Sequence, residues 1–382
     1  MIERLRITTK LCAIAGAVFF SMALSSCFGG GEGHYSGQGA LSIATWNLQA
    51  LFDERDDGWE YEEYRDGAGW TGEKYTARLN HIAAAIGEIG ENPPDIIALI
   101  EVENRGILEK LSTENLSGQG YKHCFFAGNT GYSLGIGVLS KYPFVRAIAH
   151  SINVNGTIIP RPIMEIALQP NDGNLVLFVC HWKSKLGGDE QTEIIRREAV
   201  RVILRRQAEI QRETPDIAIA ILGDLNENYD EFYRRSGGQV CALMPDDPEA
   251  ASLAGYSPVE TDNEDETKTQ GLVNVQDFLI LSTEKPPYSS FFAGARGTFY
   301  SPWENELKNG SYYYSGVWET IDHFLLNENF FTEDGWHFKN CYVIDCEPFI
   351  NSKGEPNRYN PRTGSGLSDH LPLLLTLLKT NS

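Results

Sequence analysis

Residues 220–228 read AILGDLNEN. The stretch ends an apolar run of the kind that forms a strand buried on both faces. A glycine, a carboxylate and an amide follow at once, and glycine lets the chain turn tightly as it leaves a sheet. Since side chains alternate along an extended chain, Leu225 points back into the core while Asp224 and Asn226 face the same side. We therefore expect a polar site at the end of this strand.

Five other apolar runs end in, or lead into, residues of the same chemical kind. These residues are Asn47, Glu101, His181, the pair Asp322 and His323, and the pair Asp369 and His370. A buried strand has little use for one such residue at its end. Six runs with this feature predict a polar pocket at the mouth of a sheet core.

The residue types in this pocket suit the hydrolysis of phosphate esters. Three of them are hard oxygen ligands for Mg²⁺, Mn²⁺ or Ca²⁺: Glu101, Asp224 and Asp369. Asn47 and Asn226 can bind a metal through the carbonyl oxygen or donate hydrogen bonds to phosphate. His181 and His370 can act as general base and acid near neutral pH, and a carboxylate such as Asp322 fixes the tautomer of a neighbouring histidine. Together these groups can activate water and stabilise charge on a phosphoryl oxygen.

Six short motifs, in their order along the chain, resemble those of the endonuclease/exonuclease/phosphatase superfamily of metal-dependent phosphoesterases. The motifs are Thr45-Trp46-Asn47, Pro94-Asp95-Ile96-Ile97-Ala98-Leu99-Ile100-Glu101, Cys180-His181-Trp182-Lys183-Ser184-Lys185, Gly223-Asp224-Leu225-Asn226, Thr320-Ile321-Asp322-His323 and Ser368-Asp369-His370. Each motif is weak alone, but the ordered set covers residues 41 to about 378. The resemblance implies an α/β (α+β) fold, a four-layer α/β/β/α sandwich with two packed mixed sheets flanked by helices.

The resemblance also implies which residues hold the metal. Glu101 is the main ligand, aided by Asn47 and Asp369, and the ion is Mg²⁺ or Mn²⁺, with Ca²⁺ as a further option. Two positions depart from the family pattern, because Ile100 stands where glutamine is common and Gln49 stands where many nucleases carry an acid. These departures leave open how the metal is held and whether one ion or two bind.

Five further residues receive catalytic roles from the resemblance. Asp224 orients or deprotonates the attacking water, and Asn226 holds the scissile phosphate. Asp322 pairs with His370, while His181 binds phosphate or protonates the leaving oxygen.

Other residues near the motifs allow two interpretations each. Arg161 and Lys183 suit phosphate binding, although surface salt bridges fit them nearly as well. His323 fits the core, or a place behind the catalytic groups, better than catalysis. Tyr312–Tyr314 and Trp318 either stack on a base, sugar or lipid, or pack on one another as an aromatic hairpin.

The N-terminus has the features of an export signal. Basic residues precede an apolar run at 11–24 that is short for a bilayer span and fits a signal peptide. Leu24-Ser25-Ser26-Cys27 resembles a bacterial lipobox, with an ordinary secretory leader as the alternative. We expect residues 1–27 to be a lipoprotein signal peptide and residues 28–40 a flexible tether. The protein would then be anchored through Cys27 to a bacterial membrane, on the outer membrane, the periplasmic face or the cell surface.

The rest of the chain, residues 41–380, is expected to form one domain. The composition, 42% hydrophobic and 22% charged, is that of a globular protein. Apolar periodicity predicts helices over 75–89 and 191–213, the second with its arginines on a solvated face, and loops are expected over 245–269 (acidic) and 289–317. Cys341 and Cys346 either form a disulfide or remain free thiols.

The formal net charge of −20 limits the choice of substrate. Such a chain has no overall attraction for nucleic acid or anionic membrane, so a phosphate-bearing substrate needs a local basic patch or a bound cation. We predict a divalent-metal-dependent phosphodiesterase, foremost an exported nuclease acting on DNA or RNA, with no protein partner. The first alternative is a phosphoesterase of the same fold acting on a sphingophospholipid, a phosphoinositide or a nucleotide. The second is a non-catalytic surface binding protein, which would usually have lost a site carboxylate or histidine.

Overall fold

A computed structural model describes residues 39–128, 132–256, 276–288, 291–292, 295–307 and 309–379. The expected signal peptide at 1–27, nearly all of the tether at 28–40 and most of the acidic loop at 245–269 lie outside these residues. In the described part of the chain, no helix combines the length and the apolar character needed to cross a membrane.

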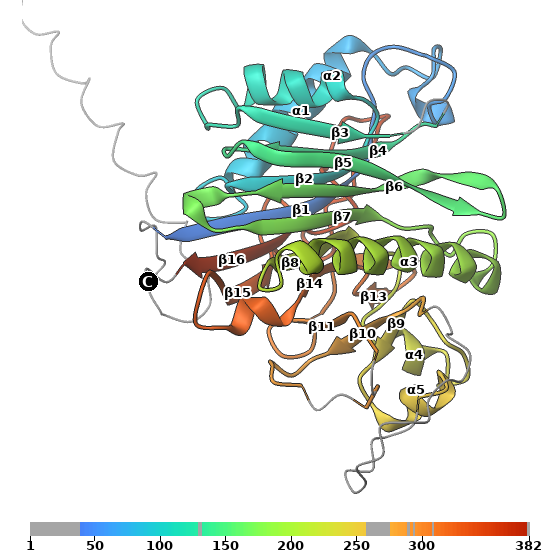
Figure 1. The fold of residues 1–382 in the computed structure, drawn as a ribbon. Helices are drawn as coiled ribbons and strands as arrows, with labels where there is room; N and C mark the ends of the chain where they lie inside the picture. The colour runs from blue at the N-terminus through green and yellow to red at the C-terminus, as the bar shows by residue number, and fades with distance from the viewer. Residues whose placement is uncertain are drawn as a thin grey trace, which may run out of the picture. The chain divides into compact units, whose positions relative to one another are not determined.

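Two mixed sheets form the centre of the domain (Figure 1). The first contains, in spatial order, β15 (Trp336–Val343), β16 (Leu373–Lys379), β1 (Ala40–Leu51), β2 (Ile96–Val102), β4 (Gly135–Ser140) and β3 (His123–Ala127). The second contains β5 (Phe144–Val154), β6 (Thr157–Leu168), β7 (Leu175–His181), β8 (Ala218–Asp224), β14 (Asp322–Leu326), β11 (Thr298–Tyr300), β10 (Leu279–Ser282) and β9 (Leu243–Pro245). A separate hairpin pairs β12 (Tyr312–Tyr314) with β13 (Val317–Glu319).

The helices complete the layers. They are α1 (Gly72–Gly87), α2 (Arg105–Lys110), α3 (Asp189–Glu213), α4 (Glu231–Arg234) and α5 (Pro248–Leu253). One apolar cluster fills the space between the sheets, a second joins α1 to the first sheet, and a third joins α3 to the second sheet. The predicted four-layer sandwich of two mixed sheets with flanking helices is confirmed.

The sequence pattern predicted α1 correctly but missed two short strands. The helix expected over 75–89 is α1, which begins after Thr71, whose hydroxyl accepts a hydrogen bond from the backbone N–H of Lys74. The stretch 289–317 was expected to be loop, but it contains β11 and β12, so this prediction is wrong in part. The structure does not contain the possible disulfide between Cys341 and Cys346.

The arginines of α3 are less solvated than the sequence indicated. Arg196 is fully buried among carboxylates, which corrects the prediction of a solvated face at this position. Arg206 reaches the buried Glu165 of β6, which also contacts Arg146 at 2.7 Å and His150 at 2.7 Å. Although burial opposes the shift, these partners lower the pKa of Glu165 to about 2.

Candidate active site

Three polar residues lie in one row across the second sheet. The strands β7 and β8 run parallel with His181 beside Asp224, and β14 runs antiparallel with Asp322 beside Asp224. Neighbouring residues in one row of a sheet project to the same face. All three are almost fully buried, with exposed fractions of 3%, 3% and 1%.

The first sheet supplies Asn47 and Glu101 to the same place. Pairing of β1 with β2 is irregular after Asn47, and Gln49, Ala50 and Glu101 all have positive φ angles. This turn lets the backbone N–H of Ala50 donate to Glu101 Oε2 at 2.8 Å. The Asn47 amide crosses between the sheets and donates to Asp224 Oδ2 at 3.0 Å. The two sheets therefore meet at their strand ends in one polar cluster, as the sequence predicted.

His181 lies between the carboxylates of the two sheets. Its Nε2 is 3.7 Å from Glu101 Oε1 and 3.8 Å from Asp224 Oδ2, too far for a hydrogen bond to either. Burial lowers the pKa of His181 well below its usual value, and the positive charge of Arg161 adds to this effect. Burial also raises the pKa of Glu101, and burial together with Asp322 raises the pKa of Asp224 to about 7.

Asp322 and His370 form a hydrogen-bonded pair. His370 Nδ1 lies 2.8 Å from Asp322 Oδ2, and Ser311 Oγ donates to the same oxygen at 2.6 Å. Although burial opposes the shift, Asp322 and then Asp224 raise the pKa of His370 to about 10. The Trp46 indole N–H donates to the backbone carbonyl of His370 at 3.0 Å, which ties the pair to the first sheet.

The other predicted residues border this cluster. Asn226 has a positive φ of 52°, and its amide donates to the backbone carbonyl of Trp182 at 3.1 Å, a carbonyl that Arg161 also contacts. Asp369 is partly exposed and lies 3.3 Å from Arg358. Lys183 donates to carbonyl groups of its own loop, at 2.8 Å to Leu186, so its ammonium group is engaged locally.

The oxygen-rich donor set fits a hard divalent cation. Asp224, Asp322 and His370 present ligand atoms that all lie within 4.8 Å of one another. The second carboxylate oxygen of Asp322 is buried without a hydrogen-bond partner in the described structure, which leaves it available to a cation. Carboxylates that raise one another's pKa are stabilised by a positive charge placed between them. The assignment of Glu101, Asn47 and Asp369 as the metal ligands stays a prediction.

Two supporting residues gave no clear signal in the sequence. Arg78 of α1 is buried, stacks over the Tyr359 ring at 3.4 Å from its centroid, and donates to the carbonyls of Leu48 and Gln49. It therefore holds the turn that presents Ala50 to Glu101. The apolar periodicity of α1 identified its buried face but gave no reason to expect a buried arginine there.

Arg196 joins the loop that follows His181 to the loop that carries Asn226. Its guanidinium donates to Glu227 Oε1 at 2.8 Å and to the carbonyl of Lys183 at 2.9 Å. Glu227 is fully buried and follows Asn226 directly in the chain. The ion pair thus fixes the loop after β7 against the loop after β8.

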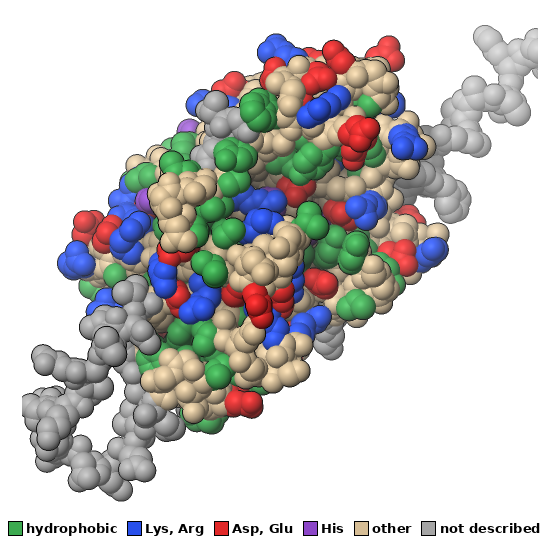
Figure 2. Space-filling view, turned by 90° about the vertical axis from the view of Figure 1, so that its right-hand side faces the viewer, with side chains coloured by type: hydrophobic (Ala, Val, Ile, Leu, Met, Phe, Trp, Pro, Cys, Tyr) green, Lys and Arg blue, Asp and Glu red, His purple; other side chains and the backbone are tan. Residues whose placement is uncertain are grey.

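The strands β1 and β7 both end on the right-hand side of Figure 1, so the polar residues at their ends lie toward this side of the molecule. Figure 2 shows this side, with basic and acidic side chains gathered in a hollow near its middle and hydrophobic side chains around them.

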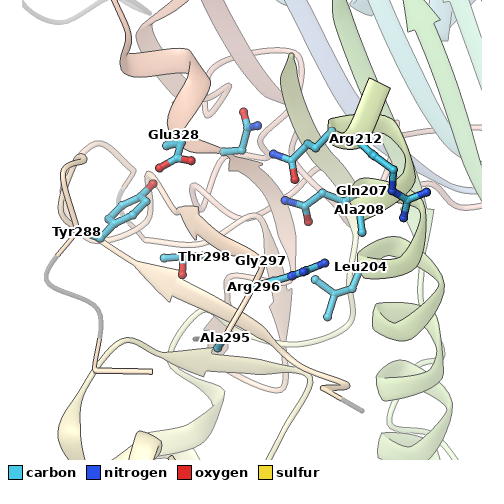
Figure 3. Close-up of a pocket in the computed structure, with 12 residues that line it drawn as sticks. Leu204, Gln207, Ala208, Arg212, Tyr288, Ala295, Arg296, Gly297, Thr298 and Glu328 are labelled. Carbon is cyan, nitrogen blue, oxygen red and sulfur yellow. The ribbon is translucent and has the colours of Figure 1, made fainter. Parts of the chain in front are cut away.

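A second cavity, of about 580 Å³, lies elsewhere (Figure 3). It is lined by the C-terminal half of α3 and by residues near Tyr288, Thr298 and Glu328. Asn327 lines it and hydrogen-bonds Ile219 near the start of β8, whereas Asp224 ends that strand. The cavity is therefore at the opposite end of the sheet from the polar cluster and contains none of the predicted site residues.

Comparisons with known proteins agree with this architecture. The model of the endonuclease/exonuclease/phosphatase family matches residues 42–284. Humanised TDP2 of D. rerio is 14% identical with a TM-score of 0.50, covering 90% of this chain and 99% of that one. Truncated TDP2 of Caenorhabditis elegans is 13% identical with a TM-score of 0.50, covering 89% and 97%. ANGEL2, a 2′,3′-cyclic phosphatase, is 13% identical with a TM-score of 0.53, covering 88% and 95%. At these sequence identities the likeness to the solved structures concerns the fold. No curated protein sequence matches the chain.

Proposed function

Since the chain belongs to the endonuclease/exonuclease/phosphatase family, we propose that it hydrolyses phosphodiester bonds with the help of a divalent metal, foremost as an exported nuclease. The observation that carries the proposal is the convergence of both sheets on one cluster. Asn47 of the first sheet donates to Asp224 of the second, and the Asp322–His370 pair lies beside it. A binding protein that had kept only the fold would have no need for these buried, mutually strained carboxylates.

The attacking water and the scissile phosphate would bind between Asp224 and Asn226. Asp224 would accept a hydrogen bond from the water through its carboxylate and orient the oxygen for attack. Asn226 would turn its amide from the Trp182 carbonyl to a phosphate oxygen. A divalent ion held by Glu101, with Asn47 and Asp369 beside it, would supply Lewis-acid stabilisation of charge on the phosphoryl group.

The histidines and Arg161 would act on the phosphate from the other sides. His181 Nε2 has no hydrogen-bond partner within reach among the carboxylates beside it, so it is available to donate to a phosphate oxygen. Asp322 fixes His370 with a proton on Nδ1 and leaves Nε2 for the reacting group. Arg161 extends its positive charge toward Glu101 and Asp224 and would neutralise the substrate.

The function is tested with a panel of substrates at fixed Mg²⁺ or Mn²⁺. Supercoiled plasmid, single-stranded DNA, RNA and bis(p-nitrophenyl) phosphate are incubated with the protein, with Asp224→Ala and with an EDTA-treated sample. Cleavage of nucleic acid that both controls abolish would support the nuclease. Cleavage of the small diester alone would support the chemistry and redirect the search to lipid or nucleotide substrates. Failure to hydrolyse any of them would overturn the proposal in favour of a binding protein.

Export and anchoring through Cys27 are part of the same proposal. A lipid anchor would hold the enzyme outside the cytoplasm, where DNA and RNA from other cells are available. A Cys27→Ser variant should then leave the membrane fraction, and a variant that stays there would contradict the anchor.

A further inference from the structure

The hairpin of β12 and β13 presents its aromatic rings on two faces. Tyr313 packs on Trp318 with ring centroids 5.1 Å apart, and Trp318 contacts the apolar cluster beneath α1. Tyr312 and Tyr314 project to the opposite face, because side chains alternate along a strand. Their rings are nearly parallel, with planes 7° apart and centroids 6.2 Å apart. The hairpin therefore does not pack entirely on itself, and one face remains for another partner.

This second face is joined to the Asp322–His370 pair. The Tyr312 ring lies 4.5 Å from the His370 ring, and the two residues form a β-bridge. Ser311, which precedes Tyr312, accepts from the backbone N–H of Leu371 at 2.7 Å and donates to Asp322 at 2.6 Å. Backbone and side-chain contacts thus fix Ser311 and Tyr312 relative to the Asp322–His370 pair, and Tyr314 follows two residues later in the same strand.

The Tyr314 ring, at the tip of the hairpin, is open to solvent. Tyr314 is 57% exposed, although the hairpin that carries it is held firmly. An exposed aromatic ring that stacks on a second ring beside the candidate active site offers a flat surface for a base. The two rings are stacked in parallel planes and do not form an aromatic cage. A quaternary ammonium headgroup prefers such a cage.

We propose that Tyr312 and Tyr314 form a stacking platform for a nucleobase next to the scissile phosphate, so that the enzyme prefers single-stranded nucleic acid to a diester without bases. The inference rests on the proposed function and names its substrate class. Stacking on an aromatic ring tolerates every base, so cleavage should depend on the presence of bases and little on their sequence.

The test compares two oligomers of equal length and charge, one of thymidine nucleotides and one of abasic tetrahydrofuran nucleotides. For the parent protein, the abasic oligomer should have a KM roughly 5- to 150-fold higher, the range expected for one stacked base. Tyr314→Ala should bring this ratio close to one, while Tyr314→Phe should keep it. Val317→Ala, at the same exposed hairpin tip, is the matched control and should keep the ratio as well. A parent ratio near one, or a ratio that survives Tyr314→Ala, would overturn the platform.

Direct binding separates this inference from the proposed function. Fluorescence anisotropy of a labelled thymidine oligomer is measured with the parent, Tyr314→Ala and Val317→Ala. Weaker binding for Tyr314→Ala alone would support the platform even if no diester were hydrolysed, and equal binding by all three would refute it. Sedimentation with sphingomyelin vesicles covers the other use of an exposed hairpin. Vesicle binding lost in Tyr314→Ala, with oligomer binding unchanged, would identify a membrane contact and overturn the inference.

Discussion

Replacing Arg196 by methionine removes the buried cation that joins the loop after His181 to the loop that carries Asn226. Its guanidinium lies 2.8 Å from Glu227, 2.8 Å from Glu193 and 3.3 Å from Asp189. Methionine matches much of the side-chain length but leaves Glu227 and Glu193 buried without this partner.

The expected loss of stability depends on which charged partners Glu227 and Glu193 retain in the variant. Removing one partner of a buried ion pair typically costs about 3–5 kcal/mol. Arg235 still contacts Glu193 at 2.7 Å and lies 3.6 Å from Glu227, so part of the compensation survives. We therefore expect Arg196→Met to lower the free energy of unfolding by about 3 kcal/mol, the lower end of that range. Equilibrium unfolding in urea measures it, with the slope compared between variants.

A double variant and a matched control distinguish the loss of the buried ion pair from a general effect of replacing an arginine in this helix. Adding Glu227→Gln to Arg196→Met should restore part of the loss, because the unpaired buried charge is then gone. Arg205→Met, on an exposed position of the same helix, should change the free energy of unfolding by less than about 0.5 kcal/mol. If Arg196→Met were no more destabilising than Arg205→Met, the buried network would not stabilise these loops.

Three further predictions follow from single contacts. Asp322→Asn should lower kcat on a phosphodiester by roughly 10²–10⁴-fold, because the pairing with His370 is lost. An unchanged thermal midpoint would show that the fold survives. A kcat near that of the parent would contradict a catalytic role for the Asp322–His370 pair. The pKa of Glu165 is lowered from 4.5 to about 2, so its ionised form contributes about 3 kcal/mol of stability that is present above pH 4.5 and is lost as the pH falls toward 2. Unfolding curves of the parent and Glu165→Gln should therefore differ most near pH 7 and converge near pH 2, whereas a constant difference would refute this. Gly223→Ala should cost about 2–5 kcal/mol, because φ is +119° and the added Cβ would lie 2.1 Å from the Cys180 carbonyl oxygen; urea unfolding near the parent value would contradict this.

Local signals in the sequence indicated the buried strands and the polar residues at their ends, whereas the four-layer sandwich was implied by the family resemblance. Apolar runs identified the buried strands, and the polar residue at the end of each run identified the strand mouth. Asp224 and His181 meet because β7 and β8 are parallel and in register. No local pattern states that register, although the family resemblance assigned both residues to one site.

The sequence could not predict contacts that join distant segments. Ser311 donates to Asp322, and Arg78 holds the turn before Ala50, yet neither residue stands in a motif. Arg196 lies among arginines that look alike in the helical pattern, and only its neighbours in space distinguish it as buried. The short strands in 289–317 were missed for a related reason, since β11 and β12 are three residues long and depend on their partners.

We propose that Asp224 and its neighbours hydrolyse phosphodiesters with a bound divalent cation. The most direct measurement is the initial rate of bis(p-nitrophenyl) phosphate hydrolysis by chelator-treated protein as Mn²⁺ is added back, for the parent and for Asp224→Asn. We expect a hydrolysis rate near zero without metal and a saturable recovery of the rate in the parent as Mn²⁺ is added. In Asp224→Asn the recovered rate should be at least about 100-fold smaller at an equal thermal midpoint. Hydrolysis that is independent of Mn²⁺, or equal in the two proteins, would contradict it.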